Sequence, residues 1–239
     1  YVSLYICKSK LQKTNQKMAE YTKIKNNLDS IQGQLTAKCK LVIVSKFRTI
    51  DEIQCAYDIG HRTFAENRVQ ALLDRKAQLP DDIEWHLIGH LQRNKVKFIA
   101  PFIQMIHAVD SFKLLREINN QAAQHNRVIP CLIQVHIAQE ESKFGLSPAA
   151  LVAFFKNEDW HNLPNIQISG LMAMATLTDN SKQIEKEFNQ VQQLFLDTKA
   201  LYNDQLPHFT ELSIGMSSDY LLAQKYGSTM VRIGSAVFK

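Results

Sequence analysis

One pattern repeats from residue 40 to the end of the chain: a short apolar run rich in β-branched residues, a polar turn, and a segment with the spacing of an amphipathic helix. Eight strands are predicted, over 40–46, 62–65, 84–89, 105–110, 129–137, 166–174, 210–215 and 229–238. Helices are predicted between them, over 50–59, 68–77, 92–100, 112–125, 148–157, 180–202 and 218–226. A helix between consecutive strands returns the chain to the same end of the sheet, so the pattern predicts parallel strands.

The number and order of these elements favour a closed α/β barrel. A further helix is predicted over 18–37, before the first strand, and the 239 residues suit a single (β/α)8 TIM barrel. An open doubly wound sheet in two domains is the alternative, but no linker rich in Pro, Gly or Ser marks a boundary. We therefore expect one barrel over 18–239, preceded by an N-terminal extension, 1–17, that is a candidate for disorder and is not needed by the fold.

Charge and cysteine content exclude several classes of protein. Lys and Arg exceed Asp and Glu by 28 to 23, and this surplus is spread along the chain rather than gathered into a nucleic-acid-binding stripe. No apolar run approaches the ~18 residues of a membrane helix. The four cysteines show neither CxxC spacing nor a nearby histidine cluster, so we expect no metal site, reduced thiols and a cytoplasmic location.

Lys46 stands at the place where a barrel carries its function. Functional side chains of such barrels lie where strands end and the following loops begin. The first predicted strand ends at Lys46, after the aliphatic run 41–44. Partial desolvation by that run would lower the pKa of the amine and favour its attack on a carbonyl. A solvated lysine at the end of a strand is the alternative.

The end of the seventh predicted strand is a candidate anion site. Gly215 permits a tight turn, the backbone N–H groups after it point forward from a helix N-terminus, and Ser213, Ser217 and Ser218 add hydroxyl groups. Phosphate sites are favoured after the seventh and eighth strands of these barrels. An N-cap role for Ser218 is the alternative interpretation.

The eighth predicted strand carries an arginine among apolar residues. Strand periodicity places Met230, Arg232 and Gly234 on one face. A buried guanidinium needs an acceptor, which a ligand or a structural ion pair can supply. Gly234 and Ser235 would complete a phosphate cup beside the seventh strand, because close approach of the backbone to a phosphate leaves no room for a side chain at Gly234.

Seven motifs, in chain order, carry a resemblance to a known family. They are Val44-Ser45-Lys46, Phe64-Ala65-Glu66-Asn67, Trp85-His86-Leu87-Ile88-Gly89-His90-Leu91-Gln92, Glu141-Ser142-Lys143-Phe144-Gly145, Gly170-Leu171-Met172, Ser213-Ile214-Gly215-Met216-Ser217 and Val231-Arg232-Ile233-Gly234. The set resembles the YggS/PROSC family of pyridoxal phosphate homeostasis proteins over about residues 40–238. The resemblance implies a barrel like the alanine racemase N-terminal domain (fold type III) and a pyridoxal 5′-phosphate (PLP) aldimine on Lys46.

The resemblance also implies which residues bind the cofactor. The phosphate would be held at Ser213, Gly215, Met216, Ser217, Gly234 and Ser235. The guanidinium of Arg232 would donate to the pyridine nitrogen. Asn67 would orient the cofactor or cap the following helix. By strand position His86 and Met172 would line the barrel mouth near the ring, with core packing as the alternative. The remaining candidates, His107, His125, His161 and His208, have no metal-ligand spacing and are interpreted as structural.

Three functions are compatible with this site. The expected one is a PLP-binding homeostasis protein, with apo-enzymes as possible recipients of PLP, no catalytic residue, no nucleic-acid or membrane partner, and a monomeric state. A guanidinium at the pyridine nitrogen makes the ring a weak electron sink, which disfavours the alternative of a PLP-dependent racemase. A racemase would also need a second base, which alanine racemase takes from a second domain. A cofactor-free aldolase would use Lys46 but leave the cup and Arg232 without a common ligand.

Overall fold

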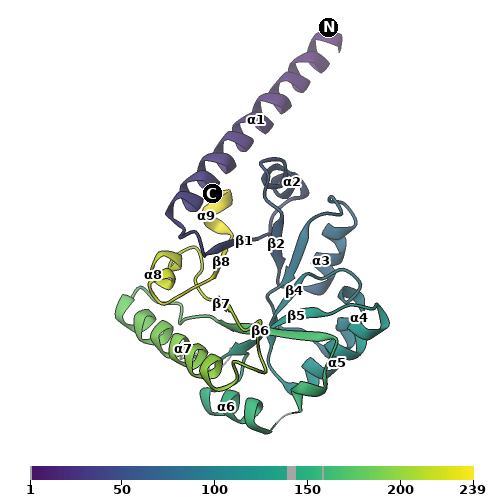
Figure 1. Ribbon diagram of the computed structural model, residues 1–239. Helices are drawn as coiled ribbons and strands as arrows, with labels where there is room; N and C mark the ends of the chain where they lie inside the picture. The colour runs from purple at the N-terminus through teal and green to yellow at the C-terminus, as the bar shows by residue number, and fades with distance from the viewer. Residues whose placement is uncertain (1, 139–143, 158) are drawn as a thin grey trace.

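The computed structural model describes the backbone of residues 2–138, 144–157 and 159–239 and shows a closed eight-stranded barrel (Figure 1). Each strand pairs in parallel with the next, and β8 pairs with β1. The strands are β1 (Lys40–Val44), β2 (Thr63–Glu66), β3 (Glu84–Leu87), β4 (Met105–Val109), β5 (Ile129–Val135), β6 (Ile166–Ala173), β7 (Glu211–Ser213) and β8 (Met230–Ile233). The predicted barrel is confirmed.

Helices surround the barrel in the predicted alternation. They are α1 (Val2–Gln34), α2 (Ile50–Asp58), α3 (Val69–Lys76), α4 (Val96–Ile99), α5 (Phe112–Gln124), α6 (Pro148–Asn157), α7 (Ser181–Leu201), α8 (Tyr220–Lys225) and α9 (Ser235–Phe238), with 3₁₀ turns η1 (Arg93–Lys95) and η2 (Trp160–Asn162). The prediction of a strand over 229–238 is wrong at its end. The strand stops at Ile233, and α9 follows Gly234 because Val237 N–H donates to the Gly234 carbonyl, which begins a helical turn.

The barrel buries two apolar layers. The outer layer lies between strands and helices and includes Phe64 and Trp85, both fully buried. The inner layer consists of strand side chains that point into the barrel, and its buried members are Val42, Ala65, Met105, Ala108, Leu132, Met172 and Met230. Because side chains alternate along a strand, Met230 in this inner layer puts Arg232 on the same inner face, as the periodicity predicts.

The second half of α1 covers the wall between α8 and α2. Its side chains Ile24, Leu28 and Ile31 are buried in the outer layer, and Asn27 Nδ2 donates to the carbonyls of Val237 and Lys239 at 3.0 Å each. Toward the N-terminus α1 continues beyond the barrel (Figure 1). The proposed boundary between 17 and 18 falls inside this helix, before Ile24, the first buried apolar residue among its described side chains.

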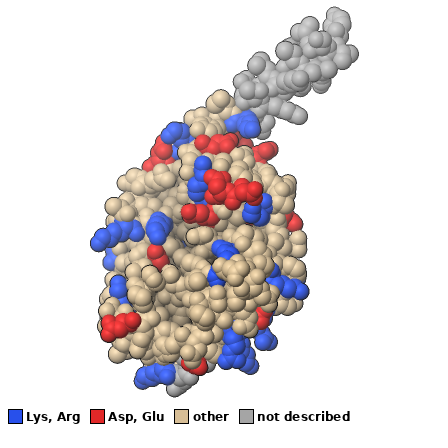
Figure 2. Space-filling view, turned by 45° about the vertical axis from the view of Figure 1, so that its right-hand side comes forward, with Lys and Arg blue, Asp and Glu red and all other residues tan. Residues whose placement is uncertain are grey.

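The described surface and its polar side chains show the following features. Acidic and basic side chains are interspersed on the face shown in Figure 2. Among the described residues, no helix has the length and apolar character needed to cross a membrane. Over the same ranges there is no cluster of His, Cys, Asp and Glu fit to hold a metal ion, and Cys39, Cys55 and Cys131 are free thiols.

Candidate functional site

The ends of β1, β7 and β8 meet at one mouth of the barrel. Ile43 of β1 pairs with Ile233 of β8, and the Arg232 N–H donates to the Gly215 carbonyl at 3.0 Å. The loops after these three strands therefore lie side by side. The structure brings Lys46, the turn at 213–217 and the pair Gly234 and Ser235 to the same mouth, as the barrel topology predicts.

Lys46 lies in a tight turn directly after β1. Its side chain is exposed, so the expected desolvation by the aliphatic residues of β1 is absent from this structure. The next residue, Phe47, has a left-handed backbone with φ of 63° and a side chain that is 86% exposed. That conformation costs a non-glycine residue about 1–2 kcal/mol. The turn closes where the Arg48 N–H donates to the Ser45 carbonyl at 3.0 Å.

A buried ion pair holds this turn from behind. Arg75 Nη2 donates to the carbonyls of Ser45 and Arg48, each at 3.0 Å, and these carbonyls flank the turn. Arg75 Nη1 lies 2.9 Å from Glu66 Oε1, which also accepts from Ser45 Oγ at 2.7 Å. We call Ser45, Glu66 and Arg75 the Glu66 cluster. Its hydrogen bonds keep the strained backbone beside Lys46 in one conformation.

The Glu66 carboxyl is strongly desolvated. Burial raises its pKa, and this effect exceeds the opposing effects of the Ser45 hydroxyl and the Arg75 guanidinium. Its second oxygen, Oε2, and Arg75 Nε have no hydrogen-bond partner among the described residues. Two polar atoms of the Glu66–Arg75 ion pair thus lack partners, and the conformation of the turn depends on this pair.

A second buried cluster runs across the barrel from β8. Arg232 is 3% exposed, and its Nη1 donates to the carbonyl oxygen and the hydroxyl oxygen of Ser213 at 2.7 and 2.6 Å. His107 Nδ1 lies 3.1 Å from that hydroxyl, and His107 Nε2 lies 3.0 Å from His86 Nδ1. We call Arg232, Ser213, His107 and His86 the Arg232 chain. Arg232 Nη2 also donates to the Ala173 carbonyl at 2.9 Å.

Electrostatically the Arg232 chain holds one positive charge. Burial lowers the pKa of Arg232 to about 10, partly offset by the charge of Asp219. Burial lowers the pKa of His86 to about 3. Burial also lowers the pKa of His107, and the nearby His86 and Arg232 lower it further. At neutral pH the guanidinium is charged and both imidazoles are neutral. No carboxylate of the described residues forms an ion pair with Arg232.

The two loops predicted to form a phosphate cup adjoin one another at the barrel mouth. Gly215 has φ of +95°, and a Cβ there would lie 2.7 Å from the Ala223 side chain, so the tight turn needs glycine. Ser217 Oγ accepts from the N–H groups of Gly234 and Ala236, both at a long 3.4 Å. Two backbone donors of the loop after β8 thus converge on a hydroxyl of the loop after β7, whereas Met216 N–H of the latter loop donates to Asp219 Oδ1 at 2.5 Å.

Glycine at position 234 is required by packing within the protein, in addition to the close approach to a phosphate that the sequence predicts. A Cβ at Gly234 would lie 2.9 Å from the Val44 carbonyl oxygen and 3.2 Å from Val44 Cβ. The contact is therefore with the neighbouring strand β1 of the protein itself. Substitution at Gly234 would disturb the barrel wall as well as the cup.

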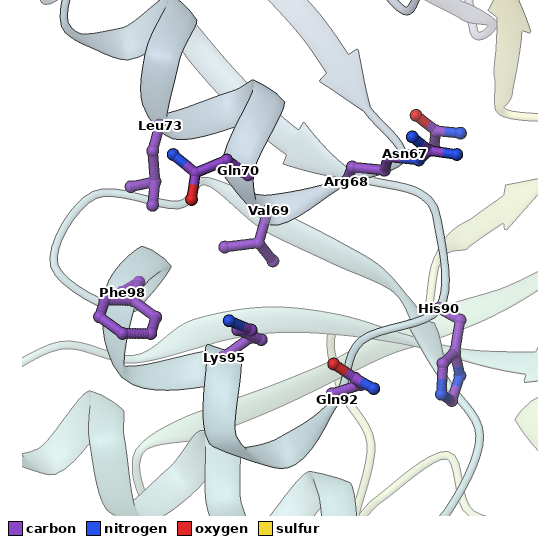
Figure 3. Close-up of a pocket in the computed structure, with 9 residues that line it drawn as sticks. All are labelled: Asn67, Arg68, Val69, Gln70, Leu73, His90, Gln92, Lys95 and Phe98. Atoms are coloured by element: carbon purple, nitrogen blue, oxygen red, sulfur yellow. The ribbon is translucent and has the colours of Figure 1, made fainter.

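Three other predicted pocket residues lie in different surroundings. Asn67 is half-buried and lines a cavity of about 300 Å³ between α3 and the η1–α4 segment (Figure 3). Neither Lys46 nor Arg232 lines that cavity. Met172 is fully buried in the inner apolar layer, and His86 belongs to the Arg232 chain. Of the fourth family motif, 141–143 lie outside the described residues.

Sequence reasoning missed His107, Glu66 and Arg75. The spacing of His107 suits no metal and indicates a structural residue, but its partners His86 and Ser213 lie 21 and 106 positions away. The available signal was periodicity, which puts His107 on the inner face with Met105. For Glu66 the signal was a carboxyl at the very end of a strand, at the mouth where function is expected.

The chain resembles proteins of one kind over nearly its whole length. The family described as "Alanine racemase, N-terminal domain" matches residues 20–239. A "Pyridoxal phosphate homeostasis protein" of Haemophilus influenzae is 35% identical over 228 residues, which are 90% of this chain and 94% of that protein. The structure of PipY of Synechococcus elongatus with PLP bound is 34% identical, with a TM-score of 0.82 over 90% of this chain and 100% of PipY. An alanine racemase of Clostridium difficile, 13% identical with a TM-score of 0.72, shares the fold over 90% of this chain and 55% of its own.

Proposed function

The chain belongs to the family of pyridoxal phosphate homeostasis proteins, and from this premise we propose that it binds PLP at the barrel mouth and acts in intracellular vitamin B6 homeostasis. The observation that carries the proposal is the buried Arg232, which keeps a full charge and an unused donor beside the phosphate cup. Both features suit a ligand with a neutral ring nitrogen and a phosphate group.

The residues at the mouth fit the chemical groups of PLP. Arg232 Nε donates to no residue in the described part of the chain, and an unprotonated pyridine nitrogen is the kind of acceptor it lacks. The N–H groups of Gly234 and Ala236 make only 3.4 Å contacts with Ser217 Oγ, which leaves them ready to donate to phosphate oxygens. Lys46 lies in the turn after the neighbouring strand β1 and is exposed.

Each residue then has a distinct role. Bound PLP supplies an aldehyde, which reacts with amines. Lys46 would hold the cofactor covalently, its amine condensing with that aldehyde with loss of water, and the Glu66 cluster holds the turn that carries this amine. Arg232 donates to the ring nitrogen, and its permanent charge disfavours a proton there. The cup N–H groups and Ser217 hold the phosphate.

These roles favour storage and delivery of PLP over racemisation. A ring nitrogen without a proton withdraws electrons weakly, so removal of an amino acid's α-proton gains little stabilisation. The exposed Lys46 suits exchange with incoming amines, which include the active-site lysines of apo-enzymes. We propose such enzymes as recipients, a cytoplasmic site of action and a monomeric carrier. Light scattering of the loaded protein checks the monomer.

The test is the site of covalent attachment. Purified protein is mixed with PLP, its visible absorption is recorded, and the adduct is fixed with borohydride and located by peptide mass mapping. We expect the main adduct on Lys46, and its loss in Lys46→Ala without loss of folding, while Lys38→Ala, a change at an exposed lysine before β1, behaves as the parent. A main adduct that persists in Lys46→Ala would refute the assignment. Exchange of the alanine α-proton faster than with free PLP would favour the racemase.

A further inference from the structure

Four buried polar side chains form a line across the inside of the barrel. Arg232 on β8, Ser213 on β7, His107 on β4 and His86 on β3 are each at most 4% exposed. The contacts along the line measure 2.6, 3.1 and 3.0 Å. The roles proposed above use only the first of these residues and the backbone near the second. Buried polar groups of this kind must be satisfied by one another.

The proton positions at Ser213 follow from the guanidinium. Arg232 can only donate, so the Ser213 hydroxyl oxygen accepts from Nη1. The one hydrogen of the hydroxyl must point elsewhere, and among the described residues the acceptor within reach is His107 Nδ1. His107 Nδ1 therefore carries no proton.

The proton positions on His107 and His86 follow in the same way. A neutral His107 without a proton on Nδ1 carries it on Nε2, and this N–H donates to His86 Nδ1 at 3.0 Å. His86 then carries its own proton on Nε2. Burial lowers the pKa of both rings, which agrees with two neutral imidazoles. One arrangement of protons satisfies all three contacts, and it is set by the arginine.

The arrangement stabilises a charge without cancelling it. Each hydrogen bond of the Arg232 chain turns its acceptor toward the guanidinium, so the dipoles along the line solvate the buried cation. A carboxylate in the same place would neutralise the cation instead, as Glu66 does for Arg75. A proton added to either imidazole would reverse or break the line.

We propose that His107 and His86 are positioning residues, which order the Ser213 hydroxyl and so keep Arg232 oriented and charged at the PLP site. The part of this proposal that concerns PLP rests on the proposed function. The part that concerns the proton arrangement is a property of the protein alone, so the two are tested separately.

The first experiment is ¹⁵N NMR of the histidine rings in protein without PLP at neutral pH, with assignments from His107→Asn and His86→Asn. We expect both rings to be neutral, with Nδ1 unprotonated and Nε2 protonated. A proton on Nδ1 of His107, or an imidazolium at either position, would overturn the proposal. This result does not depend on whether the protein binds PLP.

The second experiment compares variants at His107. Asn places an amide oxygen near the position of Nδ1 and can accept from Ser213, whereas Leu of similar size cannot. We expect His107→Leu to weaken PLP binding by about tenfold, as for ~1.4 kcal/mol, and His107→Asn to restore most of it. His208→Leu and His208→Asn, at an exposed histidine, serve as the matched control. Equal PLP affinity in folded His107→Leu and parent protein would refute the positioning role.

Thermal melting accompanies each variant. If His107→Leu does not fold, Ser213→Ala replaces it, because this smaller change removes the same link to Arg232. There the expected result is again about tenfold weaker binding together with a changed absorption band, and unchanged affinity and absorption would overturn the proposal. If the parent itself binds no PLP, the proposed function fails, while the NMR result still decides the proton arrangement.

Discussion

Two arginines flank the barrel mouth, Arg75 partly buried and Arg232 buried, and the protein compensates their charges in different ways. Arg75 lies 2.9 Å from the Glu66 carboxylate, and the pair holds the turn after β1. Arg232 donates to the carbonyls of Ser213 and Ala173 and to the Ser213 hydroxyl, which contacts His107 and through it His86, while the charge of Asp219 acts on it without an ion-pair contact. A charge cancelled by a partner can only support structure, whereas a charge solvated by neutral dipoles remains available to a ligand. The two arginines therefore mark the part of the site that holds its shape and the part that we propose recognises the cofactor.

The largest expected effect comes from breaking the Glu66 cluster. Glu66→Ala leaves the guanidinium of Arg75 without its carboxylate, and this should lower the free energy of unfolding by about 3 kcal/mol or more. Arg232→Met removes a buried charge that has no ion-pair partner among the described residues, and the buried Asp219 carboxyl loses only a through-space interaction with it, so its loss should be smaller, roughly 1–2 kcal/mol. Urea denaturation at neutral pH measures both. Equal losses would mean that the two arginines are compensated in the same way.

Lowering the pH should change the free energy of unfolding in opposite directions through the Arg232 chain and the Glu66 cluster. Burial lowers the pKa of His86 to about 3 and also lowers that of His107, so the unfolded chain binds more protons than the folded one below about pH 6.5. The stability they contribute is present above that pH and falls as pH drops, by up to about 1.4 kcal/mol per pH unit for each histidine. Burial raises the pKa of Glu66, so its contribution to stability grows as the pH falls toward 4.5, the ordinary pKa of a glutamate.

The measurement is the free energy of unfolding between pH 7 and pH 5, in the parent and in His107→Asn. We expect the parent to lose stability as pH falls and the variant to show a shallower slope. Identical slopes would contradict a neutral buried His107.

A moderate effect is expected at Gly234, which follows β8 and packs against Val44 of β1. Gly234→Ala places a Cβ 2.9 Å from the Val44 carbonyl oxygen, so both stability and PLP binding should fall, stability by roughly 1–3 kcal/mol. Ser217→Ala removes hydroxyl contacts at 3.4 Å and should weaken PLP binding by about 1 kcal/mol or less with little change in melting. The pair is measured by calorimetry and thermal melting. A Gly234→Ala protein with parental stability would place the demand for glycine in the cup alone.

The smallest effect is expected from the N-terminus. Deletion of residues 1–17 should leave melting temperature and PLP affinity unchanged, because the buried side chains Ile24, Leu28 and Ile31 remain. A drop in soluble protein or in PLP affinity would show that the extension takes part in the fold or the site.

Local patterns in the sequence predict the barrel and its mouth. The alternation of strands and helices leads to the closed sheet, and strand ends lead to Lys46 and to the cup. Periodicity puts Arg232 on the inner face. Each of these inferences needs only neighbouring residues and one rule of topology.

The partners of these residues were not predictable in the same way. His107 meets Ser213 across 106 positions, and Arg75 reaches back from a helix to the turn after β1. Such contacts depend on strand register and on side-chain direction inside the closed barrel, which periodicity alone does not specify. The packing of Gly234 against Val44 likewise depends on how closely β8 approaches β1.

The protonation of the cofactor's ring nitrogen tests the central claim most directly, since that claim is an uncancelled Arg232 charge facing the ring. PLP labelled with ¹⁵N in the ring is bound to the parent and to Arg232→Glu, and both proteins are checked for folding. We predict an unprotonated nitrogen in the parent and a shift toward the protonated form in the variant, where an acceptor replaces the donor. A protonated nitrogen in the parent, or the same shift in both folded and loaded proteins, would contradict the account.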